Sequence, residues 1–141
     1  MSAATIGWGT ILKCAGTAIA EVVTVDPPDE VADDVEVTHL LSINKRKEWI
    51  QGMIDGGEFA FTGNFLPGNA TQDWNTGLIA KHNTGVAEVW SLELYDNDGT
   101  ILLATFTGDA YVKRFKLQTL EANSPKRFDC TLKKTGDWTW A

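Results

Sequence analysis

Few residues of this 141-residue chain have the types and spacing that metal binding requires. His39 and His82 are its two histidines, and neither stands in a Cys/His spacing typical of a zinc site. Residues 96–99, Asp-Asn-Asp-Gly, are similar to the start of a calcium loop, but no acidic residue closes the loop at the required position. Asn and Gly tolerate positive φ, so this tetrapeptide predicts a hairpin turn. Both histidines are interpreted as structural, His82 on a helix face and His39 at the end of a strand.

The nucleophiles and carboxylates form no recognisable constellation either. The sequence contains no Gly-x-Ser-x-Gly elbow, P-loop or dinucleotide fingerprint, and nothing marks out an acid–base pair among its nineteen acidic residues. Cys14 and Cys130 are too few and too far apart for a disulfide framework, so they are predicted to be two buried thiols in a reducing cytoplasm. We therefore expect no catalytic residue, no cofactor and no metal, and a protein that is not an enzyme.

The charge of the chain is acidic and unevenly placed. The formal net charge is −7, and six acidic residues lie between positions 26 and 36 without a Lys or Arg. Seven of the cationic residues lie in the last thirty positions: Lys113, Arg114, Lys116, Lys126, Arg127, Lys133 and Lys134. Such runs are usually solvated faces; alternatively, the opposite patches meet between neighbouring subunits. An acidic chain argues against a conventional nucleic-acid binder, and no apolar run approaches the roughly 18–20 residues that span a membrane.

Alternating apolar residues and turn signals predict a mainly β fold. The expected strands are residues 18–25, 35–38, 57–65, 86–95, 101–107, 110–121 and 127–135. One helix is expected over residues 70–82, with Asn69 as N-cap, Gln72 completing a capping box and Gly85 ending it. We therefore predict a single domain over residues 1–141: a β-sandwich or partly open barrel of two packed antiparallel sheets with one flanking α-helix.

The strand over residues 57–65 has two different faces. Phe59, Phe61 and Phe65 fall on one face, which is predicted to be core. The other face is small, polar and acidic, so it is expected to stay wet; its members are Glu58, Ala60, Thr62 and Asn64. The alternative is that the helix covers this second face.

A polar segment, residues 41–55, precedes that strand. It is predicted to be a loop, mobile in the monomer, with charged and aromatic residues that suit docking onto copies of the same chain. Those residues are Lys45, Arg46, Lys47, Glu48 and Trp49. The tryptophans near the termini, Trp8, Trp138 and Trp140, are interpreted as packing anchors, with ligand platforms as the alternative.

The order and content of these pieces resemble the tail tube protein, or major tail protein, of siphoviruses. The resemblance covers most of the chain: residues 9–12 (Gly-Thr-Ile-Leu), 19–25, 35–38, 52–64, the helix and the closing strands 106–121 and 127–134 follow in the family's order. It implies a β-sandwich with a flanking helix, assembled as hexameric rings that stack into a hollow tube. That tube would carry a tape measure protein during assembly and DNA during ejection.

The resemblance also implies roles and partners. Lys45, Arg46, Lys47, Glu48 and Trp49 would stack one ring on the next, and Glu58, Ala60, Thr62 and Asn64 would face the lumen as a small, net negative wall. Further partners would be tail-tip and terminator proteins; DNA would pass without specific binding, and no membrane is involved. The protein would be made in the host bacterial cytoplasm and reside in the virion tail. The alternatives are a monomeric β-sandwich binding module, such as a carbohydrate-binding domain, and a terminator or secretion-system ring protein with the same fold.

Overall fold

The computed structural model describes residues 3–141, so the first two residues of the predicted domain lie outside it. The described residues form nine β-strands, one α-helix and one 3-10 turn. In chain order they are β1 (Ile11–Cys14), β2 (Thr17–Ala18), β3 (Val22–Asp26), β4 (Val31–Glu36), η1 (Ile43–Lys45), β5 (Trp49–Asp55), β6 (Glu58–Asn64), α1 (Leu78–Thr84), β7 (Glu88–Tyr95), β8 (Leu102–Leu117) and β9 (Arg127–Trp140).

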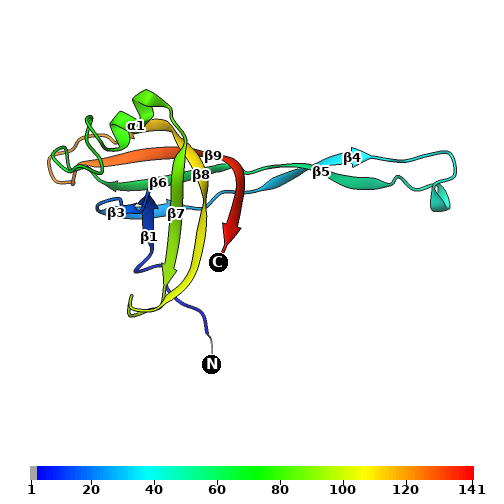
Figure 1. Cartoon of the computed structure of the whole chain (residues 1–141), viewed down its shortest axis with the longest axis horizontal. Helices are drawn as coiled ribbons and strands as arrows, with labels where there is room; N and C mark the ends of the chain where they lie inside the picture. The colour runs from blue at the N-terminus through cyan, green and yellow to red at the C-terminus, as the bar shows by residue number, and fades with distance from the viewer. Residues whose placement is uncertain (1–2) are drawn as a thin grey trace.

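Seven of these strands form one antiparallel sheet that curls over itself. Its order is β2-β1-β7-β8-β9-β6-β3, and β4 and β5 form a separate two-stranded sheet. Figure 1 shows β7 running across the direction of β6 and β9. Although β8 and β9 separate β6 from β7 in the sheet, the Phe61 and Trp90 rings of β6 and β7 lie 6.2 Å apart. The predicted mainly β fold is confirmed as a partly open barrel, and the second sheet projects from it.

The core fills the inside of this curl, and the alternation of the sequence decides which residues enter it. Phe59 and Phe61 are buried, as predicted, and Phe65 is half-buried against Phe115. Aromatic rings dominate the packing: Phe106, for example, lies 5.0 Å from Trp138 and 6.0 Å from Phe59. The inward positions of β9 and β7 supply both aromatic and aliphatic side chains to the same cluster, including Phe128, Leu132, Trp90 and Leu92.

The strands predicted over residues 101–107 and 110–121 are in fact one strand, β8. Gly108 does not break this strand but is a packing site: a Cβ there would lie 2.3 Å from the Trp138 ring. The pairing register of β8 with β9 shifts at this point, and the Trp138 Nε1–H donates to the Asp109 carbonyl at 2.7 Å. Trp138 is thus a packing anchor, as predicted, whereas Trp8 and Trp140 are largely exposed.

The predicted helix is shorter than expected and begins later, because its proposed cap residues have other partners. Asn69 Oδ1 accepts from the Thr71 N–H and caps a turn, so the capping-box prediction is wrong. Gln72 is fully buried and joins three segments: its amide donates to the carbonyls of Ala20 (2.8 Å) and Asn64 (3.0 Å) and accepts from the Leu66 N–H. Helix α1 starts after Gly77 and ends before Gly85, as predicted, and Gly85 takes the left-handed C-cap conformation.

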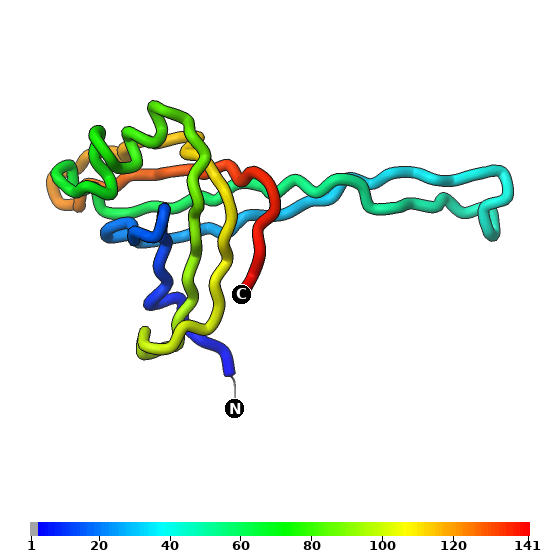
Figure 2. Tube along the Cα trace, in the orientation of Figure 1, coloured from blue at the N-terminus to red at the C-terminus, as the bar shows by residue number. Residues whose placement is uncertain are grey.

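Residues 27–57 form a long arm that leaves the barrel, visible at the right of Figures 1 and 2. The prediction of a loop over residues 41–55 is wrong in its second half, because Trp49–Asp55 is β5, paired antiparallel with β4. The apolar residues of β5 do not alternate regularly, which hid the strand, and a register shift between Ala32 and Asp34 disturbs the period further. The tip of the arm is therefore limited to residues 37–48.

We expect Gly108→Ala to lower the free energy of unfolding by about 1–3 kcal/mol, because the added methyl group would overlap the Trp138 ring and force it out of its site. Urea denaturation followed by tryptophan fluorescence measures this difference. Gly68→Ala is the matched control, since nothing lies within 4 Å of the position that a Cβ would take there. Equal stability of the two variants would contradict the assigned packing.

Candidate assembly surfaces

Glu58, Ala60, Thr62 and Asn64 lie together on the outer face of the sheet, as the alternation predicts. Each polar member has a partner from another segment of the chain. Glu58 accepts from the Lys113 ammonium, and the hydroxyls of Thr62 and Thr24 lie 2.6 Å apart. Asn64 donates to Glu21 at 3.3 Å. The strand thus presents an ordered polar row to its surroundings.

Helix α1 does not cover this polar row. Its buried residue, Leu78, belongs to the core with Phe59 and Phe61, which occupy the opposite face of β6. Glu58 and Ala60 remain exposed. The alternative that the helix packs on the Glu58 face is therefore wrong.

The charges on this face are paired within the protomer. Lys133 lies opposite Glu58 in the register of β6 and β9, and its ammonium lies 3.1 Å from Asp55. The pKa of Asp55 is lowered, first by the Gly57 N–H and then by Lys133, and the pKa of Lys113 is raised by its hydrogen bond to Glu58. The wall expected to be net negative is locally neutralised by lysines.

Four of the five residues predicted to dock lie in the tip of the arm and the fifth lies next to it, but they differ in role. Lys45, Arg46 and Lys47 are exposed, and no ion pair to them exists in the described part of the chain. Glu48 is used internally: its carboxylate accepts from the Ser42 hydroxyl at 2.8 Å and lies 3.4 Å from His39 Nε2. Trp49, 54% exposed, begins β5. His39 lies in this tip, beyond the end of β4, and not at a strand end.

The arm also exposes many apolar side chains, which the sequence analysis did not single out. They include Val31, Val35, Leu40, Leu41, Ile43, Ile50, Met53 and Ile54, with Leu41 86% and Met53 85% exposed. No other part of the described protomer packs on this two-stranded ribbon, so its faces are not buried within the protomer. Exposed apolar surface of this extent on a protruding element indicates an interaction surface. In the sequence, this surface is indicated by two adjacent apolar pairs within a charged segment, Leu40-Leu41 and Met53-Ile54.

A buried lysine fixes the base of the arm. The Lys134 side chain is 1% exposed and forms an ion pair with Glu30, which precedes β4. Its ammonium lies 4.7 Å from the ring centroid of Phe106 and 5.2 Å from that of Trp138. Continuing the alternation of β9 beyond Leu132 places residue 134 on the core face, so this role could have been found in the sequence.

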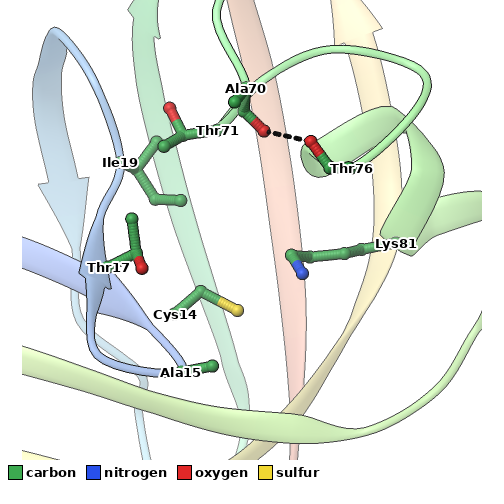
Figure 3. A pocket seen from close by; sticks show the side chains of 8 residues that line it. All are labelled: Cys14, Ala15, Thr17, Ile19, Ala70, Thr71, Thr76 and Lys81. Carbon is green, nitrogen blue, oxygen red and sulfur yellow. Dashed lines mark hydrogen bonds between the residues drawn. The ribbon is translucent and has the colours of Figure 1, made fainter.

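One pocket lies between the β1–β2 hairpin, the 70–76 segment and α1 (Figure 3), with a volume of about 270 Å³. The Cys14 thiol at its wall donates to Glu88 at 2.9 Å, and Lys81 lies 2.8 Å from the same carboxylate. Burial and the Glu88 bond raise the pKa of Cys14 to about 12, and burial also raises the pKa of Cys130. Both cysteines are buried free thiols, as predicted.

Neither a metal-binding cluster nor a long apolar helix is found in residues 3–141. Those residues contain no group of three or more His, Cys, Asp or Glu that could hold a metal ion. The Asp96 carboxylate accepts from the N–H groups of Thr100 and Ile101, so residues 96–99 form the predicted turn. None of the described helices is long and apolar enough to cross a membrane.

The fold and its surfaces define a structural β protein with a projecting arm. A model of the lambda phage tail tube protein family matches residues 12–117, and the chain therefore belongs to that family, whose members are structural tail tube proteins. No curated protein matches the chain in sequence.

Solved structures of tubes and their caps have the same fold. The sheath/tube terminator of the extracellular contractile injection system PVC is 15% identical, with a TM-score of 0.80 over 100% of this chain and 99% of that one. The tail of an empty gene transfer agent particle, refined with C6 symmetry, is 15% identical, with a TM-score of 0.72 over 98% and 99%. The SPP1 tail tube is 13% identical, with a TM-score of 0.68 over 97% and 78%.

We expect Lys134→Met to lower the free energy of unfolding by roughly 1–3 kcal/mol, because it removes the cation between two rings and leaves Glu30 unpaired. Lys133→Met, the neighbouring control, removes only a pair with the exposed Asp55 and should change stability by about 0.5 kcal/mol or less. Chemical denaturation measures both. A larger loss in the Lys133 variant would show that Lys134 is not the anchor.

Proposed function

We propose that this protein assembles into hexameric rings that stack into the tail tube of a virion, through which DNA passes at ejection. One observation carries the proposal: the arm presents apolar side chains on both faces, and the protomer has nothing to cover them. Family membership supports the tube, and the C6 symmetry of the related gene transfer agent tail supports the ring number. The role is structural, without catalysis or a cofactor.

The arm is the element that joins one ring to the next. It projects away from the barrel (Figure 2), and its tip combines Lys45, Arg46 and Lys47 with exposed Leu41 and Ile43. Burying such side chains between copies stabilises the assembly by roughly 25 cal/mol per Å² of apolar area. Partners at the two tube ends are tail-tip and terminator proteins.

The polar row of β6 lines the lumen in this proposal. Sheets from six copies would place Glu58, Ala60, Thr62 and Asn64 around the channel and close the exposed sheet edges. The Glu58–Lys113 and Asp55–Lys133 pairs support easy transit, because cations held by neighbouring carboxylates bind DNA phosphates less strongly. The tape measure protein would occupy the same channel before the genome.

Two other functions predict different particles. A monomeric binding module, such as a carbohydrate-binding domain, would stay monomeric at high concentration. A tube terminator shares the fold but would stop at a single ring. Negative-stain electron microscopy of the purified protein distinguishes monomers, single rings and long tubes.

We expect Leu41→Ser combined with Ile43→Ser to leave the monomer folded and to abolish tube growth, because both side chains are 74% or more exposed and add nothing to the core. Circular dichroism checks the fold, and electron microscopy with pelleting checks assembly. Ile101→Ser is the control: that side chain is 62% exposed but lies off the arm, in the β7–β8 turn. Tubes of normal length from the arm variant would remove the proposed role of the tip.

We expect Glu58→Lys to assemble into tubes whose DNA ejection is slower and more salt-sensitive. The change places a third ammonium beside Lys113 and Lys133 and frees Lys113 to bind phosphate. Ejection from virions carrying the variant is followed by DNA release at several salt concentrations. Glu58→Gln, which removes the charge without reversing it, should show a smaller effect. Ejection that is unchanged in the Lys variant would place Glu58 outside the channel.

A further inference from the structure

The cations that take no part in ion pairs form two groups at opposite ends of the molecule. Among the residues that the structure describes, ion pairs use Lys13, Lys81, Lys113, Lys133 and Lys134. Three of the other cations lie at the arm tip. The remaining four lie where β8 ends and β9 begins, and we name them the basic end: Arg114, Lys116, Lys126 and Arg127. Figure 1 shows this β8–β9 connection, in orange, at the extreme opposite to the arm tip.

The basic end is an outward-facing part of the sheet. Phe115 and Phe128 alternate with its residues and stack inward, with ring centroids 5.4 Å apart. Three acids lie nearby: Asp129, which is opposite Lys116 and accepts from the Gln118 amide; Glu121, in the connection; and Glu21, which accepts from the Asn64 amide. Arg127 contacts the Asn64 amide oxygen at 3.4 Å. The patch therefore keeps an excess of positive charge.

This patch has apolar neighbours. Leu117, at the end of β8, is 39% exposed, and Leu120, in the connection, is 61% exposed. A surface that combines cations with uncovered leucines fits a partner that carries carboxylates beside apolar side chains.

The arm shaft has this composition. We name Asp33, Asp34 and Glu36 of β4 the acidic shaft; all three are exposed, and no hydrogen bond or ion pair of their side chains occurs in the described structure. The paired strand β5 contains no Lys or Arg to balance them. Val35 and Ile50 face each other on the same ribbon and are 43% and 55% exposed.

We propose that the acidic shaft of one copy lies on the basic end of the next copy in the tube. The inference rests on the proposed function and names the surface that receives the arm. The charges of the two surfaces match, because carboxylates without partners would meet cations that take no part in ion pairs. The cations of the arm tip are a poorer match, because they lie on the same hairpin as the shaft and have leucines of the arm itself as neighbours.

Charge reversal tests this pairing. In the shaft variant, Asp33, Asp34 and Glu36 become Lys; in the end variant, Arg114, Lys116 and Lys126 become Glu. Each alone should fold and raise the protein concentration needed for tube growth by about tenfold or more, because like charges then face each other. The two sets combined in one chain should restore growth, as measured by pelleting and electron microscopy.

A second combination is the matched control. It joins the shaft variant to Lys45→Glu, Arg46→Glu and Lys47→Glu, which has the same total charge but reverses the tip instead of the basic end. It should not restore growth. If the Lys substitutions prevent folding, Asp33→Asn, Asp34→Asn and Glu36→Gln should raise the required concentration in the same direction by a smaller factor.

The outcomes separate the inference from the proposed function. Tubes from the wild type without rescue by the combined reversal, or with equal rescue by the control, overturn the pairing alone. Normal tubes from the shaft variant would mean that the shaft carboxylates only keep the arm edge solvated. That result also overturns the pairing. Duplex DNA that binds the wild type but not the end variant, with tubes intact, would assign the basic end to nucleic acid. A wild type that remains monomeric overturns both proposals.

Discussion

The arrangement of the whole molecule depends on one buried ammonium group. An ammonium costs several kcal/mol to bury unless it is paired, and Lys134 meets this condition with Glu30 and with the faces of Phe106 and Trp138. Trp138 lies in β9, Phe106 lies in β8, and Glu30 lies between β3 and β4, at the base of the arm. The same contact that completes the aromatic core therefore also holds the base of the arm, and the arm leaves the barrel in a direction set by the core.

The curl of the sheet explains why one face is wet. A single sheet that folds over itself can bury only its inner face, so Phe59 and Phe61 are covered while Glu58 and Ala60 are not. The sheet also keeps two edges, at β2 and β3. In the protomer, cross-strand hydrogen bonds such as Thr24–Thr62 satisfy polar groups of the outer row.

The sequence predicted those features that depend on local period, and missed those set by distant contacts. Alternation placed Phe59 and Glu58 on the correct faces, and the left-handed Gly85 ended the helix as expected. Gln72 resembles a local cap in the sequence because its three partners lie up to 52 residues away. Gly108 resembles a strand break in the sequence. The side chain that requires a glycine there, Trp138, comes thirty positions later and from another strand. The structure places Lys45, Arg46, Lys47, Glu48 and Trp49 in or next to the arm tip, and their mobility and their docking role remain predictions.

The arm of the monomer is held together by its own hydrogen bonds. An isolated two-stranded ribbon is marginal in water, yet this one is anchored at its base and closed at its tip, where Val37 N–H donates to the Glu48 carbonyl at 2.9 Å. Glu48 also fixes Ser42, so the tip cations project from a formed turn. A preformed arm loses less conformational entropy on docking than a disordered loop, so more of the apolar burial appears as affinity. In the proposed assembly, the exposed leucines of the tip would be buried without first having to order the segment that carries them.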